Sequence, residues 1–201
     1  MPGINYFFLL LLLSVSCDNK DSPGTVCKSN IVIDIQPFNG ISAYQTQYVF
    51  TELKKNYSFI EIKKIIALPQ SAWYPPRNRY RADSLIHFLN LQTAKGHITI
   101  GLTNKDISTT TDRIADWGVM GLGFCPGNSC IASSFRLSKT ETNMQLFKVA
   151  VHELGHTQGL PHCNIKSCFM RDAEGRNPTN DEKDFCIKCK SILIQKGWNL
   201  R

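Results

Sequence analysis

Hydrophobic side chains recur with two different periods along the first half of the chain. Residues 31–38 alternate and are rich in β-branched side chains, which predicts a first strand. Residues 41–57 carry apolar side chains at roughly helical spacing, and residues 58–69 then indicate a second strand. Residues 81–92 predict a second helix, and residues 97–103 predict another strand. Strands that alternate with helices favour an α/β layer with a largely parallel sheet.

The second half begins with shorter elements and then a long helix. Residues 117–124 and Cys130–Leu137 predict short strands. Ser138–Glu141 has the capping-box pattern, which predicts the start of a helix, and Gly159 is suited to end it in a left-handed turn. One face of this helix is predicted to pack on the core through side chains three and four residues apart, namely Met144, Phe147, Val151 and Leu154.

The N-terminus has an apolar run that is too short to span a bilayer. Tyr6–Leu13 fits the central region of a signal peptide, so residues 1–16 are interpreted as a signal peptide. The small residues that end in Cys17 resemble a bacterial lipobox, whose cysteine is lipidated, although no Lys or Arg precedes the apolar run. Ordinary secretion without lipidation is the alternative. Residues 17–29 are polar and are interpreted as a tether between a membrane anchor and the folded body.

Length and charge limit the remaining possibilities. The chain has 201 residues and is 42% hydrophobic, which is enough for one core, and residues 30–201 are expected to form one domain. Its formal net charge of +7 comes from scattered lysines without interleaved aromatic residues. We therefore expect no nucleic-acid partner. From the N-terminal segment we expect export to the cell envelope as a membrane-anchored lipoprotein. We expect the chain to be a monomer.

The stretch with the clearest chemistry is His152–Cys163, which reads HELGHTQGLPHC. His152 and His156 lie four residues apart, so a helix presents both imidazoles on one face. Glu153 stands where a carboxylate can reach a zinc-bound water without binding the metal. Gly159 turns the chain back, and His162 can then supply a third nitrogen. Three protein ligands leave one position open for water, which is typical of a catalytic zinc site.

Five positions of H-E-x-x-H alone could arise by chance among surface histidines, but the run continues through Gly159 to His162. The complete pattern H-E-x-x-H-x-x-G-x-x-H resembles the metzincin signature. Metzincins also have a methionine turn beneath the metal, and Met170 follows His162 closely enough to fill that role. The alternative is a purely structural role, in which Met170 fills a gap in the core.

Four cysteines extend the resemblance to one family within the metzincins. Together with the histidine run, the arrangement C-x4-C-x-M followed by C-x-x-C closely resembles the archaemetzincin family. The cysteines concerned are Cys163, Cys168, Cys186 and Cys189. The resemblance implies a metzincin-like zincin domain of α/β (α+β) class, with a mixed, mostly parallel twisted sheet, an active-site helix and a small zinc-stapled C-terminal subdomain. It also implies two zinc ions (Zn²⁺) per chain: a catalytic zinc held by the three histidines and a structural zinc held by the four cysteines.

The predicted export of the chain supports a competing interpretation, in which its cysteines form disulfides. An exported protein with eight cysteines normally forms disulfides, whereas C-x-x-C spacing is commoner in zinc sites. Cys125 and Cys130 fit neither pattern clearly and either form a local disulfide or remain free. Cys27 has no evident partner.

These residues predict a zinc metalloprotease that hydrolyses peptide or protein substrates. Glu153 would deprotonate the zinc-bound water and later protonate the leaving amine. Cys130–Leu137 occupies the place of the edge strand that pairs with substrate in metzincins. Some metzincins add a tyrosine two residues after the methionine of the turn, but this chain has Asp172 there. The alternative is an envelope-anchored zinc-binding or interaction protein with little or no turnover.

Overall fold

A twisted five-stranded sheet forms the centre of the protein. The computed structural model describes residues 31–112 and 114–200. Strand order in the sheet is β2-β1-β5-β9-β8, and all neighbouring strands are parallel except β8, which is antiparallel to β9. The strands are β1 (Val32–Pro37), β2 (Ile60–Ile62), β5 (His97–Thr103), β8 (Gly121–Gly123) and β9 (Ser129–Ser133). The predicted mixed, mostly parallel sheet is therefore confirmed.

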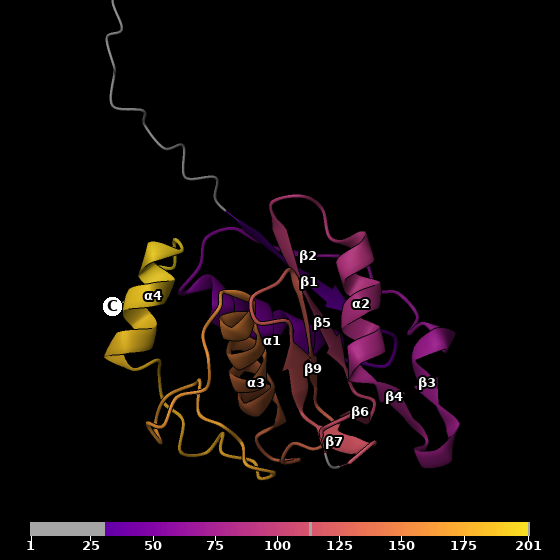
Figure 1. The fold of residues 1–201 in the computed structure, drawn as a ribbon. Helices are drawn as coiled ribbons and strands as arrows, with labels where there is room; N and C mark the ends of the chain where they lie inside the picture. The colour runs from indigo at the N-terminus through magenta and orange to yellow at the C-terminus, as the bar shows by residue number, and fades with distance from the viewer. Residues whose placement is uncertain (1–30, 113, 201) are drawn as a thin grey trace, which may run out of the picture.

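Helices cover both faces of this sheet (Figure 1). Helices α1 (Ala43–Lys54) and α3 (Thr142–Thr157) lie on one face, and α2 (Ala82–Gln92) lies on the other. Two apolar clusters result, because the alternating side chains of a strand point to opposite faces. Ile35 and Leu154 belong to the larger cluster on the α1 and α3 side, whereas Phe38 and Leu89 belong to the cluster around α2.

A second, smaller sheet lies beside the first and was not predicted. Its strand order is β3-β4-β6-β7, and its strands are β3 (Trp73–Tyr74), β4 (Arg79–Arg81), β6 (Ile107–Thr109) and β7 (Trp117–Val119). Short 3₁₀ helices at Gln70–Ala72 and Pro75–Arg77 flank β3. The predicted strand at residues 117–124 is thus split at Met120 between two sheets.

The C-terminal segment packs against the main core. Helix α4 (Ile187–Gln195) buries Cys189 and Leu193. Beyond the helix, the ring of Trp198 lies 5.2 Å from that of Tyr57, centroid to centroid. Aromatic contact of this kind fixes the last residues of the chain against a segment that follows α1.

One local prediction for α3, its capping box, was wrong. The capping box at Ser138–Glu141 does not form: α3 begins at Thr142, its N-cap Glu141 makes no side-chain capping bond, and the Ser138 hydroxyl contacts Thr140 instead. A capping box forms at the start of α1, where Ser42 and Gln45 bond each other's backbone. Helix α3 also buries more than one face, because the sheet, α1 and the C-terminal segment surround it.

Cys130–Leu137 was wrongly predicted to be the edge strand. Its ordered part, β9, lies between β5 and β8, so β8 is the edge of the sheet on this side. The signal peptide, Cys17, Cys27 and the tether lie outside the described residues. Among residues 31–112 and 114–200, no helix has the length and apolar character needed to cross a bilayer.

Candidate metal centre and active site

Three imidazoles converge at the C-terminal end of α3. His152 and His156 come from the helix, and His162 comes from the segment after the turn at Gly159, whose φ of +88° suits a residue without a Cβ. The Nε2 of His156 lies 3.0 Å from that of His152 and 3.2 Å from that of His162. Zn–N bonds of about 2.0–2.1 Å in a tetrahedral site imply nitrogens about 3.3 Å apart. These separations therefore fit a zinc ion.

Contacts on the far side of the rings determine which nitrogen faces the centre: hydrogen bonds at His152 and His156, and a nearby carboxylate at His162. The Nδ1 of His152 donates to the carbonyl of Phe169 at 2.6 Å, and that of His156 donates to the carbonyl of Leu160 at 2.8 Å. His162 Nδ1 lies 3.3 Å from a carboxylate oxygen of Asp172. Carbonyl and carboxylate oxygens only accept, so the proton sits on Nδ1 and the lone pair of Nε2 points to the centre.

Burial keeps two of these imidazoles neutral. The pKa of His152 is lowered to about 3, chiefly because the ring is buried and secondly because His156 lies beside it. Burial likewise lowers the pKa of His156. Neutral imidazole is the form that binds a metal, so both rings are ready to act as ligands near neutral pH.

Glu153 lies beside the histidines and is 6% exposed. Burial raises the pKa of its carboxyl group to about 8. Two glycines of the edge strand make room for it: a Cβ at Gly121 would lie 2.4 Å from Glu153 Oε1, and one at Gly123 would lie 2.9 Å from the Glu153 carbonyl oxygen. The strand and the glutamate can approach this closely only because both positions lack a side chain.

Met170 is fully buried beneath the helix, where its sulfur lies against Gly155. A Cβ at Gly155 would lie 2.3 Å from Met170 Sδ. The Met170 carbonyl accepts a hydrogen bond of 2.7 Å from the amide of Cys163, which follows the third histidine. Met170 therefore forms a turn under the site and is hydrogen-bonded to the segment that carries His162.

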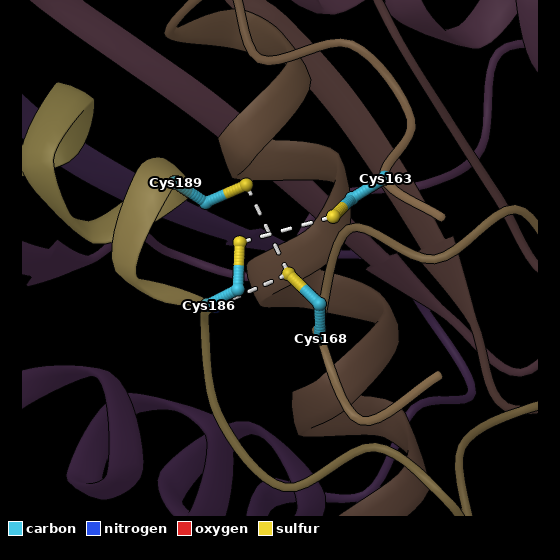
Figure 2. Close-up of side chains that lie close together, drawn as sticks. All are labelled: Cys163, Cys168, Cys186 and Cys189. Atoms are coloured by element: carbon cyan, nitrogen blue, oxygen red, sulfur yellow. Dashed lines mark hydrogen bonds between the residues drawn. The ribbon is translucent and has the colours of Figure 1, made fainter. Parts of the chain in front are cut away.

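The four predicted cysteines also come together (Figure 2). Their Sγ atoms all lie within 4.8 Å of one another. Cys163 and Cys186 have their sulfurs 3.8 Å apart, as do Cys168 and Cys189. A disulfide needs about 2.05 Å, whereas Zn–S bonds of about 2.3 Å in a tetrahedron imply sulfurs about 3.8 Å apart. Cys163, Cys168, Cys186 and Cys189 are free thiols that fit a zinc ion.

Cys125 and Cys130 are also free. Cys130 is buried in β9, where burial raises the pKa of its thiol. Cys125 is exposed, and its sulfur lies 3.5 Å from the Leu160 carbonyl, the same oxygen that accepts from His156. The local disulfide left open by the sequence does not form.

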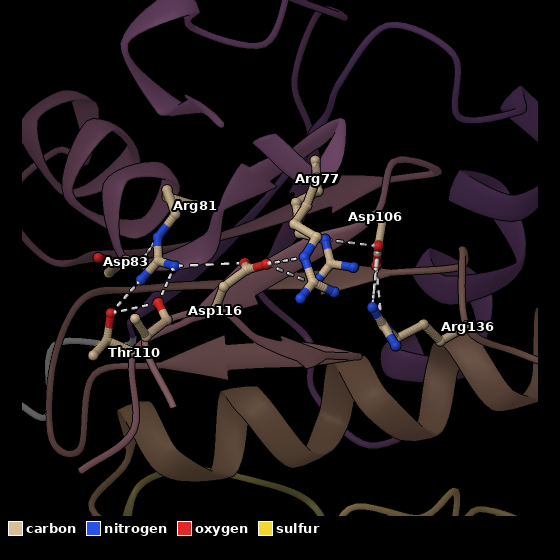
Figure 3. Close-up of polar contacts among 9 residues, drawn as sticks. Arg77, Arg81, Asp83, Asp106, Thr110, Asp116 and Arg136 are labelled. Atoms are coloured by element: carbon tan, nitrogen blue, oxygen red, sulfur yellow. Dashed lines mark hydrogen bonds and ion pairs between the residues drawn. The ribbon is translucent and has the colours of Figure 1, made fainter. Parts of the chain in front are cut away.

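A cavity of about 560 Å³ contains the three histidines and Glu153. Its lining residues come chiefly from three segments: β8 with the residues just before it, α3, and the loop after Met170. Arg136 also lines the cavity and is held by the carboxylate of Asp106 (Figure 3). The edge of β8 that faces away from β9 borders this space and has no strand beside it among the described residues. A peptide can therefore pair with it.

Comparison with known proteins identifies the family. Residues 46–184 match the peptidase family described as Matrixin. The archaemetzincin of Haloquadratum walsbyi is 26% identical over 177 residues, which cover 81% of this chain and 99% of the relative. That of Methanopyrus kandleri is 30% identical over 135 residues, which cover 65% of this chain and 75% of the relative. The chain belongs to the archaemetzincin family.

Solved structures agree with this assignment. The crystal structure of the archaemetzincin from Archaeoglobus fulgidus, complexed with malonate, has a TM-score of 0.68 at 25% identity and covers 81% of this chain and 99% of that one. The archaemetzincin structure from Methanopyrus kandleri has a TM-score of 0.71 at 24% identity, covering 84% and 96%, and supports the fold. This archaemetzincin is a zinc-dependent metallopeptidase that acts on peptides or proteins, and the alternative of a binding protein without turnover is not favoured.

Sequence reasoning missed three contributors to the site. Asp172 was noted only because it replaces a tyrosine, yet its carboxylate contacts His162. Arg136 gave no signal in the sequence, because it reaches the cavity only through the path of the chain after β9. The only signal for Gly121 was the glycine-rich run at residues 117–124, which does not show that the strand lies against Glu153.

The close approach of Gly121 to the glutamate generates a prediction. In Gly121→Ala the new methyl group would meet Glu153 Oε1 at 2.4 Å, so the carboxylate must move. A displacement of about 1 Å lowers catalysis about 10²-fold. We expect peptide hydrolysis to fall by that factor while the zinc content, measured by atomic absorption, stays unchanged. Wild-type kcat/KM in this variant would show that the close approach of Gly121 does not position Glu153.

Proposed function

We propose that this archaemetzincin cleaves peptide bonds with Glu153 as general base and general acid beside a zinc ion held by His152, His156 and His162. The observation that carries the proposal is the convergence of three Nε2 lone pairs next to a buried carboxylate in one cavity. A zinc ion held by three imidazoles acts as a Lewis acid: it would polarise a carbonyl group and lower the pKa of a bound water to about 7.

Other groups of this chain bind the substrate, transfer the proton and orient the metal ligands. The free edge of β8 pairs with the substrate backbone and presents the scissile bond to the cavity. Glu153 accepts the proton of the attacking water and transfers it to the amine that leaves. The carbonyls of Phe169 and Leu160 and the carboxylate of Asp172 hold the three rings in the orientation that a metal needs.

We also propose a second, structural zinc on Cys163, Cys168, Cys186 and Cys189. Sulfur separations of 3.8 Å support it, and the four thiolates would close the coordination sphere. Cys163 adjoins His162, so a metal at the cysteines would restrain the third catalytic ligand. In this arrangement the structural zinc stabilises the catalytic centre.

The role of Glu153 is tested by Glu153→Ala. The variant should keep its catalytic zinc, because the carboxylate is not a ligand, and should lose about 10²–10⁴-fold in kcat/KM on a mixed peptide library. Glu61→Ala, at an exposed position on β2, serves as a control that should retain activity. Comparable turnover in Glu153→Ala would exclude Glu153 as the proton carrier.

The second zinc is tested by metal analysis. Purified protein should contain about two zinc ions per chain, and a chelator should remove the one at the histidines first, because that site is open to water. Cys186→Ser should contain about one zinc, melt at a lower temperature and hydrolyse peptides more slowly. Cys27→Ser, a matched thiol change outside both groups of predicted ligands, should keep both ions. One zinc per chain, with no thiols released on denaturation and chelation, would indicate disulfides instead.

We further propose that Cys17 is lipidated and holds the folded body at a membrane outside the cytoplasm. The support is the sequence alone: a short apolar run, small residues, Cys17 and a polar tether. Cys17→Ser should move the protein from the membrane fraction to the soluble fraction without loss of peptidase activity. Cys27→Ser is the matched control and should stay with the membrane. Equal membrane fractions for Cys17→Ser and the parent protein would exclude lipidation at this residue.

A further inference from the structure

Arg136 presents a fixed guanidinium group to the active-site cavity. Its Nε and Nη2 donate to the two carboxylate oxygens of Asp106 at 2.8 and 3.0 Å, so the group is held by two parallel bonds (Figure 3). The chain leaves room for it at Gly118, where a Cβ would lie 2.1 Å from Nη2. A cation held in this way loses little side-chain entropy when it binds a ligand.

Asp106 is shared between two arginines of a larger charged cluster. Asp106 is buried and also forms an ion pair of 3.1 Å with Arg79, which in turn pairs with Asp116 at 3.3 Å. Three aspartates and four arginines make up this cluster, so it keeps one excess positive charge: Asp83, Asp106, Asp116, Arg77, Arg79, Arg81 and Arg136 (Figure 3). The side chain of Arg136 is 34% exposed, and its Nη1 bonds to no other residue in the described part of the chain. Arg136 thus offers positive charge and a free donor, which suits a carboxylate.

The direction of the substrate decides which of its groups meets Arg136. Strand β8 runs from Gly121 to Gly123, and its outer edge is free. Antiparallel pairing is the commoner kind in proteins. A peptide paired in this way runs opposite to β8, so its residues after the scissile bond pass Gly121 and then approach Gly118. Its C-terminal side therefore points to Arg136.

The bend at Met120 lies between the two groups. Glu153 lies beside Gly121 in β8, and Arg136 lies beside Gly118 in β7, so the two contacts are three residues apart along the chain. Three residues span at most about 10 Å even when fully extended. A carboxylate that meets Arg136 therefore belongs to a residue that follows the scissile bond closely.

The cavity is bounded just beyond this point. Trp117 precedes Gly118, and its indole carbons would lie 3.1 and 3.4 Å from a Cβ at Gly175, in the loop that follows Met170. Trp117 and Gly175 both line the cavity. A polypeptide that continued past Arg136 would meet this contact between two lining segments, whereas a chain that ended there would not.

We propose that Arg136 binds the C-terminal carboxylate of peptides that end shortly after the scissile bond, so that this archaemetzincin releases short C-terminal peptides. The inference rests on the peptidase function proposed above and names its substrate class. Water adds across the amide bond: the shortened peptide gains a carboxylate, and the short C-terminal peptide leaves with a new amino group and its original carboxylate.

The test compares N-acetylated pentapeptides that end in a free carboxylate with the same peptides ending in an amide. The acids should be cleaved with a kcat/KM about 10–100-fold higher, the size expected for one charged hydrogen bond. Arg136→Met should bring this ratio close to one, and Arg136→Lys should give an intermediate ratio. Because both peptides are measured on the same variant, a reduced folded fraction cancels. Arg176→Met removes another cation of the same cavity and should keep the wild-type ratio.

Two measurements on the wild-type protein decide the matter even if the Arg136 variants do not fold. Mass spectrometry should show loss of a short C-terminal peptide of constant length, and calorimetry should show that this peptide binds more tightly as an acid than as an amide. Cleavage that is equally fast for acids and amides, or that occurs away from the C-terminus, would overturn the role of Arg136 while leaving the peptidase intact. No hydrolysis of any peptide would overturn the proposed function itself.

Discussion

Three unprotonated imidazole nitrogens that face one another at 3.0 and 3.2 Å repel each other unless a cation lies among them. This constraint explains much of the surrounding structure. Each ring must be held from behind by an acceptor, and the chain supplies the carbonyls of Phe169 and Leu160 and the carboxylate of Asp172. Two of these acceptors lie in the turn around Met170, so the turn and the helix form one rigid unit.

The cysteine cluster restrains the same turn from its other side. Cys163 is bonded through its amide to the Met170 carbonyl, and Cys168 immediately precedes Phe169, whose carbonyl orients His152. The amide of Cys186 donates to the Cys168 sulfur at 3.3 Å, which ties the start of α4 to this segment. Movement at the sulfurs is therefore transmitted to His162 through its peptide bond with Cys163, and to His152 through the hydrogen bond of the Phe169 carbonyl. The position of a cysteine directly after His162 follows from this coupling.

Local sequence predicted the parts of the site that depend on short spacing. The histidines, Glu153 and Cys163 follow from helical geometry and one turn, so twelve consecutive letters contain the information. The start of α3 was mispredicted because the Ser138 hydroxyl and the Gln145 side chain form other local bonds, which compete with the capping box. The identity of the edge strand could not be predicted, because it depends on β8 folding back antiparallel onto β9, which is a choice of tertiary pairing.

Glycines in the strand at residues 117–124 show why the remaining features escaped prediction. Glycine weakens a strand and carries no side chain for the core, so propensity argues against its presence at three positions of one short segment. Gly118 gives room to Arg136, and Gly121 and Gly123 give room to Glu153. The strand thus gives up intrinsic stability where charged side chains must approach its backbone. The glycines are explained by the side chains that fill the space beside them. Arg136 comes from the segment after β9 and Glu153 comes from α3, and only the folded chain brings both to the same edge of the sheet.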